Sequence, residues 1–183
     1  MANSCKISAP IKFEVCDTYV GGVAKVAFAN WDKNHSFTVS SGDCEVDTIS
    51  LANGEKIYEV DTFDDSVFFN VNLNDNTTFK NYTHLVEGII GHIDCNVLNT
   101  YKDWSLGKLV AFVLTNDGEV YILGADNGMS ATQFDIQSGT AKSDQGGITF
   151  HFEGIQKNTA LKVKDWSIVA EHFPTQNPST PNP

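Results

Sequence analysis

Histidine and cysteine are the residue types in this 183-residue chain best suited to hold a metal ion. His84 and His92 fall on one face of a predicted strand, but eight residues at about 3.3 Å each separate them by roughly 20 Å or more, too far to share one ion. The cysteines form no C-x-x-C pair, which leaves zinc or dithiol chemistry without local support. Two disulfides are arithmetically possible, but we expect four reduced, mostly buried thiols and no metal centre. The cysteines are Cys5, Cys16, Cys44 and Cys95.

A local run of acidic and amide side chains could in principle offer oxygen ligands to calcium. The spacing of an EF-hand loop is missing from it, and acidic strand ends and turns are ordinarily solvated. We therefore expect no calcium site and no cofactor. The run comprises Asp61, Asp64, Asp65, Asn72, Asn74 and Asp75.

The familiar catalytic signatures are missing from the sequence. It contains no G-x-S-x-G nucleophile elbow, no G-x-G-x-x-G fingerprint and no P-loop. We expect a protein without catalysis. The enzyme alternative, an unrecognised hydrolase, requires a pocket in which a perturbed acid or histidine adjoins a nucleophile.

Tryptophan supports another alternative, a carbohydrate- or surface-binding β-sandwich of the fibre or adhesin type. Trp31, Trp104 and Trp166 could form a sugar-stacking platform if they are exposed. Tryptophan is more often largely buried, and Trp104 lies on the apolar face of a predicted helix. This alternative requires at least one exposed tryptophan near a concave face.

The net charge of −11 argues against wrapping nucleic acid, because phosphate binding depends on clustered Lys and Arg, and the 12 here are scattered. An acidic wall would instead let a duplex slide past without adhering. The longest apolar runs are too short to cross a bilayer, so no membrane partner is expected. The N-terminal residues lack the basic start and apolar stretch of a secretion signal, which predicts folding in a cytoplasm.

Period-two alternation of apolar and polar residues predicts strands along most of the chain. Strands on both sides of a single helix predict a mainly β fold, a β-sandwich or barrel with one short flanking α-helix. We expect a single β-rich domain over residues 1–173 and an extended or disordered Pro-rich tail over 174–183. The predicted strands are 11–16, 23–30, 36–40, 44–51, 55–61, 66–73, 83–93, 109–114, 119–124, 132–138, 147–155 and 161–173.

The helix is predicted over about residues 95–106. Val97, Leu98, Tyr101 and Trp104 fall on one face of it. Asp94 or Asn96 can cap its start, and Gly107 is expected to end it in the left-handed conformation.

Glycine turns punctuate the strands. Asn53-Gly54 predicts a tight hairpin, and Asn116-Asp117-Gly118 predicts another. With Asp126-Asn127-Gly128 turning the chain out of the following strand, we expect a three-stranded meander whose edges could accept strands from another chain. The polar segment that begins at Gly139 is too long for a tight hairpin and is expected to be mobile unless something holds it.

Between residue 83 and about residue 173, a K-L-V-A strand is followed by a D/N-G turn, a Y-x-L-G strand, an N-G turn, a G-T-A-x-x-D-x-x-G loop and a T-x-x-F-x-G strand. This order of elements resembles bacteriophage tail-tube and neck-ring proteins, particularly virion proteins of phages of Bacteroidetes, including crAss-like phages. The matching residues are Lys108 to Val113, Asn116 to Gly118, Tyr121 to Gly124, Asn127-Gly128, Gly139 to Gly147 and Thr149 to Gly154.

This resemblance implies a structural virion protein without chemistry of its own. Its subunits would form a homo-oligomeric ring, six- or twelve-fold, whose sheets join around the channel through which DNA leaves. The implied partners are neighbouring portal, tail or neck rings, with DNA passing unbound through an acidic lumen, and the implied location is the virion, after assembly in the host bacterial cytoplasm. The candidate interface residues are Asp61, Asp64, Asp65, Asn74, Asp75, Gly139, Thr140, Lys142, Asp144, Gly146 and Gly147.

Overall fold

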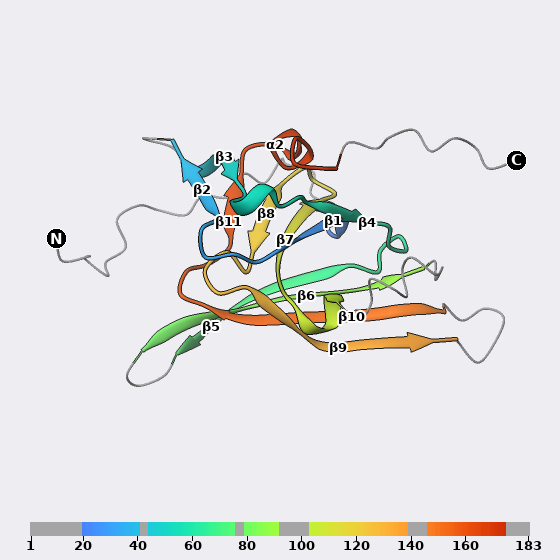
Figure 1. The fold of residues 1–183 in the computed structure, drawn as a ribbon. Coiled ribbons are helices and arrows are strands. Elements are labelled where there is room, and N and C mark those ends of the chain that lie inside the picture. Colours follow the sequence, from blue (N-terminus) through green and yellow to red (C-terminus); the bar gives the residue numbers. More distant parts are fainter. Residues whose placement is uncertain (1–19, 41–43, 76–78, 92–102, 139–145, 175–183) are drawn as a thin grey trace, which may run out of the picture.

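The computed structural model describes residues 20–40, 44–75, 79–91, 103–138 and 146–174, and these residues are mainly β (Figure 1). Eleven strands belong to one mixed sheet that stays open at β2 and β5. The mainly β prediction is therefore confirmed. The strands are β1 (Val23–Asn30), β2 (Ser36–Val39), β3 (Glu45–Ser50), β4 (Tyr58–Val60), β5 (Phe68–Asp75), β6 (Lys80–Ile90), β7 (Lys108–Thr115), β8 (Val120–Leu123), β9 (Met129–Gln137), β10 (Gly147–Gln156) and β11 (Leu161–Val163).

The sheet folds over so that two parts of it face each other as the layers of a sandwich (Figure 1). The upper part contains β4, β1, β7, β8, β11, β3 and β2, and the lower part contains β9, β10, β6 and β5. The two parts join where Lys108 and Leu109 of β7 pair with Ser130 and Met129 of β9. A single bridge between Thr62 and Ile90 joins them at another place.

The main core lies between the two layers. Alternation along β10 turns Phe150 and Phe152 inward, where their rings meet Phe28 of β1 and, from the turn before β7, Trp104. All three phenylalanines are almost completely buried. Burial on this scale contributes roughly 1.5–3 kcal/mol for each large apolar side chain.

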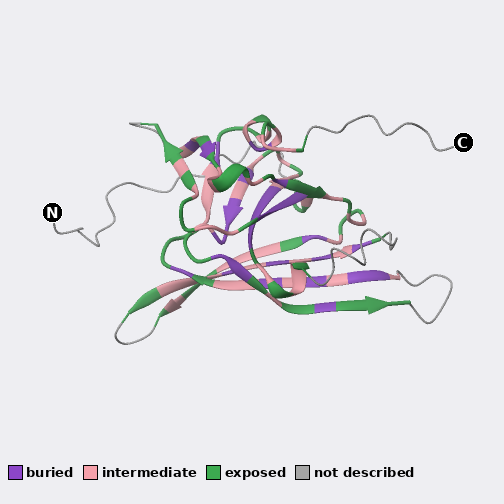
Figure 2. Cartoon of the chain, viewed as in Figure 1, coloured by how far each residue is buried: buried purple, intermediate pink, exposed green. Residues whose placement is uncertain are grey.

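A second core covers the opposite face of the upper layer. Phe112 of β7 and Ile122 of β8 are fully buried there against a short helix, α2 (Trp166–Ala170). β1 and β7 consequently bury side chains on both faces, which accounts for their almost continuous apolar sequences. Figure 2 shows this burial in the upper layer, while β2 and the far ends of β5 and β9 are exposed.

The prediction of one strand over residues 161–173 is wrong beyond residue 163. β11 ends there, and Asp165 caps α2 by accepting a hydrogen bond from the Ser167 N–H at 2.7 Å. Hydrogen bonds from the Ser167 hydroxyl and from its N–H lower the pKa of the Asp165 carboxyl. Trp166, Val169 and Phe173 then pack at helical spacing into the second core. The strand prediction missed two signals of a helix. Asp165 is a typical N-cap residue, and the apolar residues after it are spaced three and four positions apart.

The helix predicted at 95–106 is helical at residues 103–106, and its earlier part lies outside the described residues. Trp104 packs on Phe28, with ring centroids 5.3 Å apart, as its place on the apolar face predicted. The prediction for Gly107 is wrong, because Gly107 does not have a positive φ. Its N–H instead donates to the Asp103 carbonyl at 3.0 Å, which closes the turn without a left-handed residue.

The glycine turns are partly as predicted. Residues 116–118 connect the paired strands β7 and β8, with Gly118 at φ +84°. Asn53 and Gly54 both have positive φ, but the strands on either side pair with other strands, so their hairpin is wrong. The meander is also wrong, because β9 lies beside β7 rather than β8. Residues 124–128 carry the chain past the end of β7 to join the lower layer.

Several predictions fall on residues that are not described. They are the strand at 11–16, the first part of the helix, the segment 139–145 and the tail beyond residue 174. Cys44 is exposed, and the other three cysteines lie outside the described ranges. No helix in the described ranges is long and apolar enough to span a membrane.

Candidate functional site

The lower layer has one face that points away from the sandwich core, called here the open face. Alternation places Glu87 and Leu85 of β6 and His151 and Glu153 of β10 on it, because their neighbours in each strand face the core. No described helix or strand covers this face (Figure 1). The upper layer differs, since α2 packs on its outer side.

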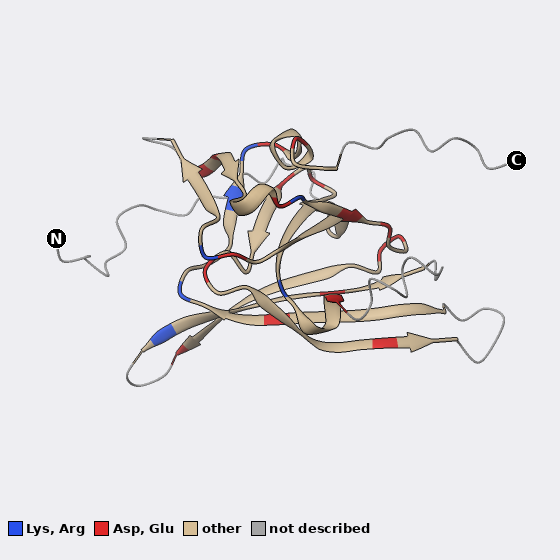
Figure 3. Cartoon of the chain, in the orientation of Figure 1, with Lys and Arg blue, Asp and Glu red and all other residues tan. Residues whose placement is uncertain are grey.

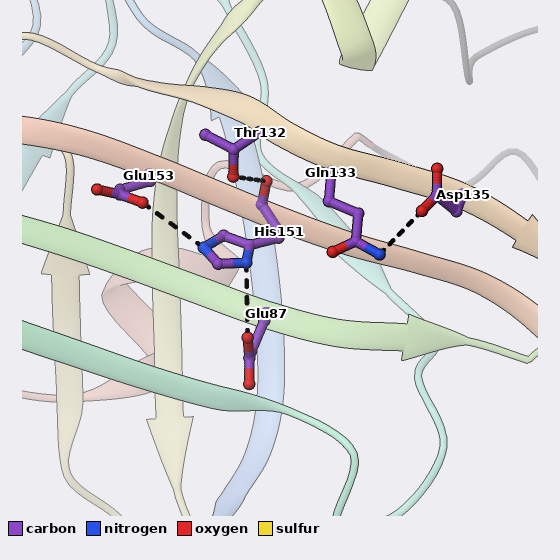
Figure 4. Close-up of polar contacts among 6 residues, drawn as sticks. All are labelled: Glu87, Thr132, Gln133, Asp135, His151 and Glu153. Atoms are coloured by element: carbon purple, nitrogen blue, oxygen red, sulfur yellow. Dashed lines mark hydrogen bonds and ion pairs between the residues drawn. The ribbon is translucent and has the colours of Figure 1, made fainter.

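His151 lies at the centre of the open face (Figure 4). Its Nδ1 is 3.6 Å from Glu87 Oε2, and its Nε2 is 3.8 Å from Glu153 Oε2. Strand pairing fixes this arrangement, because Glu87 on β6 and Gln133 on β9 are the direct neighbours of His151 on either side. On β9, Gln133 Nε2 donates to Asp135 Oδ2 at 2.8 Å.

The open face is acidic. Alternation places Glu87, Glu153 and Asp135 on it, whereas Lys80, the one Lys or Arg in the described strands β5, β6, β9 and β10, falls in the core-side row of β6. Figure 3 shows the acidic positions along these strands. Two of its carboxylates flank one imidazole. A partner that carries positive charge would be attracted to this face, and a polyanion such as DNA would be repelled.

Among the described residues, no hydrogen bond pairs the His151 ring with a hydroxyl that could act as a nucleophile. On the neighbouring strand, the Thr132 hydroxyl donates to the backbone carbonyl oxygen of His151 at 3.2 Å rather than to its ring. Glu87 and Glu153 face different ring nitrogens of His151, so the two carboxylates and the imidazole do not converge on one point. No group of three or more His, Cys, Asp or Glu side chains in the described ranges could hold a metal ion.

Two strands of the lower layer have an edge with no partner among the described strands. β5 pairs only with β6, and β9 pairs with β7 only through Met129 and Ser130, so the side of β9 over residues 131–137 is not covered by another described strand. Both strands extend beyond the sandwich as arms (Figure 1). Their core-facing rows end in exposed apolar side chains, with Leu73 at 52% and Ile136 at 54% exposure.

The predicted interface residues are divided between the two ends of the molecule. Asp61, Asp64 and Asp65 are exposed beside the bridge to Ile90. The same end holds Gly146 and Gly147, since the residue after Gly147 pairs with Ile90.

Asn74 and Asp75 lie at the other end, on the tip of the β5 arm. About 23 Å of extended strand separates Asp75 from the start of β5 at Phe68. The remaining candidates, Gly139, Thr140, Lys142 and Asp144, lie outside the described residues.

Gly147 has a structural reason for its residue type. A Cβ at this position would lie 2.3 Å from the Ile90 carbonyl oxygen, closer than any side chain allows. The glycine therefore permits the close approach of β10 to β6 within the chain.

Two hollows in the described surface lie at one end of the sandwich. One of about 400 Å³ is bordered by Thr62, Asp64, Asp65 and Asn116, without a histidine or a cysteine. Another, of about 250 Å³, lies between residues 20–23 and the strands β5 and β8.

The three tryptophans are half-buried rather than exposed. Trp31 donates its indole N–H to the Ala125 carbonyl at 3.3 Å and lies under the Lys108 ammonium. Trp166 packs against Phe173, with ring centroids 6.2 Å apart. None of them forms the flat exposed platform on which a sugar could stack.

Compared with protein-family models, with curated proteins and with solved structures, the chain matches none of them. Its function therefore has to be argued from its own residues.

Sequence reasoning did not single out His151, Glu87 or Glu153. The signal was present in GITFHFEGI, where His151 and Glu153 alternate with Phe150 and Phe152. A polar row opposite such a row of phenylalanines indicates a face turned away from a core. The pairing of β6 with β10, which brings Glu87 beside His151, could not be read from either strand alone.

His84 lies on the core side of β6 and holds two neighbouring segments of the chain. It is 2% exposed, accepts a hydrogen bond from the Gly124 N–H at Nδ1 and donates from Nε2 to the Asn158 carbonyl, each at 3.1 Å. Burial lowers the pKa of the imidazole, although the Asn158 carbonyl and the Asp126 charge act in the opposite direction. A protonated ring would also turn a donor toward the Gly124 N–H.

We expect acid to destabilise the protein through His84. The native state resists protonation, so stability is independent of this group well above the unfolded pKa of 6.5. It falls as pH drops through that value, because the unfolded chain binds the proton more readily, and it levels off below the lower native pKa. Chemical denaturation between about pH 8 and pH 5 measures this slope.

The matched variants are His84→Gln and His172→Gln. Loss of the buried imidazole in His84→Gln should flatten the slope in that range more than loss of the half-buried imidazole in His172→Gln. Equal slopes in wild type and His84→Gln would show that His84 does not cause the pH dependence.

Proposed function

We propose that this protein is a structural subunit of a phage tail or neck, forming a homo-oligomeric ring around the channel through which DNA passes, without catalysis. The proposal rests above all on the two edges of the lower layer that have no partner among the described strands. Exposed apolar side chains on both arms, and a face that no described element covers, support it further. In an isolated monomer such edges are a liability, and in a ring they become contacts.

The acidity of the open face fits a position along a DNA channel. Glu87, Glu153 and Asp135 from each of several copies would surround the channel with negative charge. DNA would then be repelled from the wall and would pass without adhering. In the virion, neighbouring portal, tail or neck rings would contact the two ends of the ring.

The carbohydrate-binding alternative is less well supported. It requires an exposed tryptophan near a concave surface, and the three tryptophans are half-buried against their own chain. The hydrolase alternative requires a pocket in which a perturbed acid or histidine adjoins a nucleophile, and no histidine lines the two hollows described above.

Native mass spectrometry and negative-stain imaging of the purified protein test the proposal. We expect closed rings of six or twelve subunits that do not shift the mobility of duplex DNA at physiological salt. A protein that remains monomeric up to its solubility limit, or rings that bind duplex DNA tightly, would contradict it.

A further inference from the structure

The two edges described above belong to the same four-stranded layer and lie on its opposite sides, with β5 at one side and β9 at the other. We propose that β5 of one copy pairs antiparallel with residues 131–137 of β9 in the next copy, so that the lower layers join into one continuous sheet. This inference rests on the proposed ring and specifies the surface that closes it.

Strand direction supports a head-to-tail contact. β5 is antiparallel to β6, β6 to β10, and β10 to β9, so β5 and β9 run in opposite directions. Rotation about an axis roughly along the strands keeps both directions, and the new pair continues the antiparallel alternation. A two-fold contact between two β5 edges would leave β9 uncovered and would end assembly at a dimer.

The faces of the two edges also match. On β5, Phe69 and Leu73 point to the core side, while Asn70 and Asn72 point to the open face. On β9, Ile136 points to the core side, while Gln133 and Asp135 point to the open face. Any register that slips by one residue would set apolar side chains against polar ones.

Among the registers that keep residues 131–137 within the length of β5, one meets this condition over residues 133–137; the β-bulge at residue 132 turns Ala131 to the core side. This register places Asn72 opposite Gln133, Asn70 opposite Asp135, and Phe69 opposite Ile136. Amide and carboxylate then meet on the open face, and two apolar side chains meet on the core side. Asp135 faces an amide rather than another carboxylate, so no like charges oppose each other in this pair.

The stagger of the two edges fits a closed ring. Within one copy, Phe68 lies in the same row as Gln133, through Glu87 and His151. In the proposed register Phe68 instead faces Gln137 of the neighbour, four positions further along β9. The offset is four residues of about 3.3 Å each along the strand, and it accumulates across four strands about 4.8 Å apart. This ratio corresponds to a strand tilt of about 35°. Closed barrels have strand tilts of about 35–45°.

Site-specific photo-crosslinking tests the contact. With p-benzoylphenylalanine at position 72 in the full chain, and isotope-labelled copies mixed with unlabelled ones, we expect crosslinks between copies to peptides containing residues 131–137. The same photoreactive group at Val39, on the edge strand β2, is the matched control and should give no such crosslink.

Charge substitution gives an independent measurement. Leu73→Lys and Ile136→Lys replace exposed side chains, so the monomer should stay folded, but each places a charge within the apolar row of the contact. Each is expected to raise the protein concentration at which half of the chains are assembled by about tenfold or more. Val39→Lys, exposed at the other end of the sheet, should leave that concentration unchanged.

The outcomes separate this inference from the proposed function. Rings that crosslink from position 72 to segments other than 131–137, or that assemble normally with both lysine substitutions, overturn the β5–β9 contact while the ring stands. Crosslinks from position 72 to β5 of another copy show a two-fold dimer and overturn both. A protein that is monomeric at every concentration also overturns both.

Discussion

Replacing Phe152 with alanine is expected to destabilise the protein by about 3–5 kcal/mol, the range for a large aromatic removed from a core. Phe152 is fully buried at the centre of the main core. Its ring lies within 5.8 Å, centroid to centroid, of Phe28, Phe134 and Phe150, and 6.4 Å from Trp104. These rings come from both layers and from the turn before β7, so they cannot all collapse into the space that Phe152 leaves.

Urea denaturation followed by tryptophan fluorescence and circular dichroism measures this loss. Ile155→Ala is the matched control, because Ile155 lies three residues further along β10 with 58% of its surface exposed. It should change the unfolding free energy by less than about 1 kcal/mol. Similar losses in the two variants would mean that the sandwich core is not where the structure places it. If Phe152→Ala does not fold, Phe152→Leu gives a smaller loss in the same direction.

The strands were predictable because each carries its own signal. β10 alternates phenylalanine with polar residues, and β1 and β7 are apolar on both faces, so their existence follows from composition and period. The partners of the strands were not predictable in the same way. β8 and β9 follow each other in the sequence, yet β9 continues past β7 into the other layer. That choice depends on which apolar faces fit together across the core.

The candidate site shows the same limit. The acidic and amide residues Asp61, Asp64, Asp65, Asn74 and Asp75 stood out because they are close in sequence, but the structure places the first three near the start of β5 and the last two at its other end. Glu87 and His151 are far apart in sequence and adjacent in the sheet. A polar face made from three strands is a property of their register, and register is fixed by the burial of the other face.

The turn after β8 shows how the two layers are held in this arrangement. Gln156, at the end of β10, is 1% exposed and makes three hydrogen bonds to the turn at residues 126–128. Its Oε1 accepts from the Asp126 N–H at 3.0 Å and the Asn127 N–H at 2.9 Å, and its Nε2 donates to the Gly128 carbonyl at 2.8 Å. One amide side chain thereby satisfies three backbone groups where the chain crosses between layers.

Gln156→Met is therefore expected to cost about 2–4 kcal/mol of unfolding free energy, although methionine has nearly the same size. The methionine side chain offers no comparable acceptor to the two N–H groups and no donor to the carbonyl, and each buried group left without a partner costs about 1–3 kcal/mol. Part of that cost is recovered if water enters the turn, which sets the lower end of the range. Equilibrium denaturation measures the total, and hydrogen exchange at the amides of Asp126 and Asn127 should accelerate more than exchange in β7.

Lys157→Met is the control for this substitution, because Lys157 is the next residue and its side chain is exposed. Its backbone N–H bonds to the Asp126 carboxylate at 3.0 Å, and that bond does not depend on the side chain. Lys157→Met should thus leave the unfolding free energy nearly unchanged. If Lys157→Met lost as much unfolding free energy as Gln156→Met, the cost would come from the added methionine and not from the three hydrogen bonds. A selective loss at Gln156 would instead mean that the crossing between layers, which the order of the strands in the sequence does not predict, is fixed by one buried polar side chain.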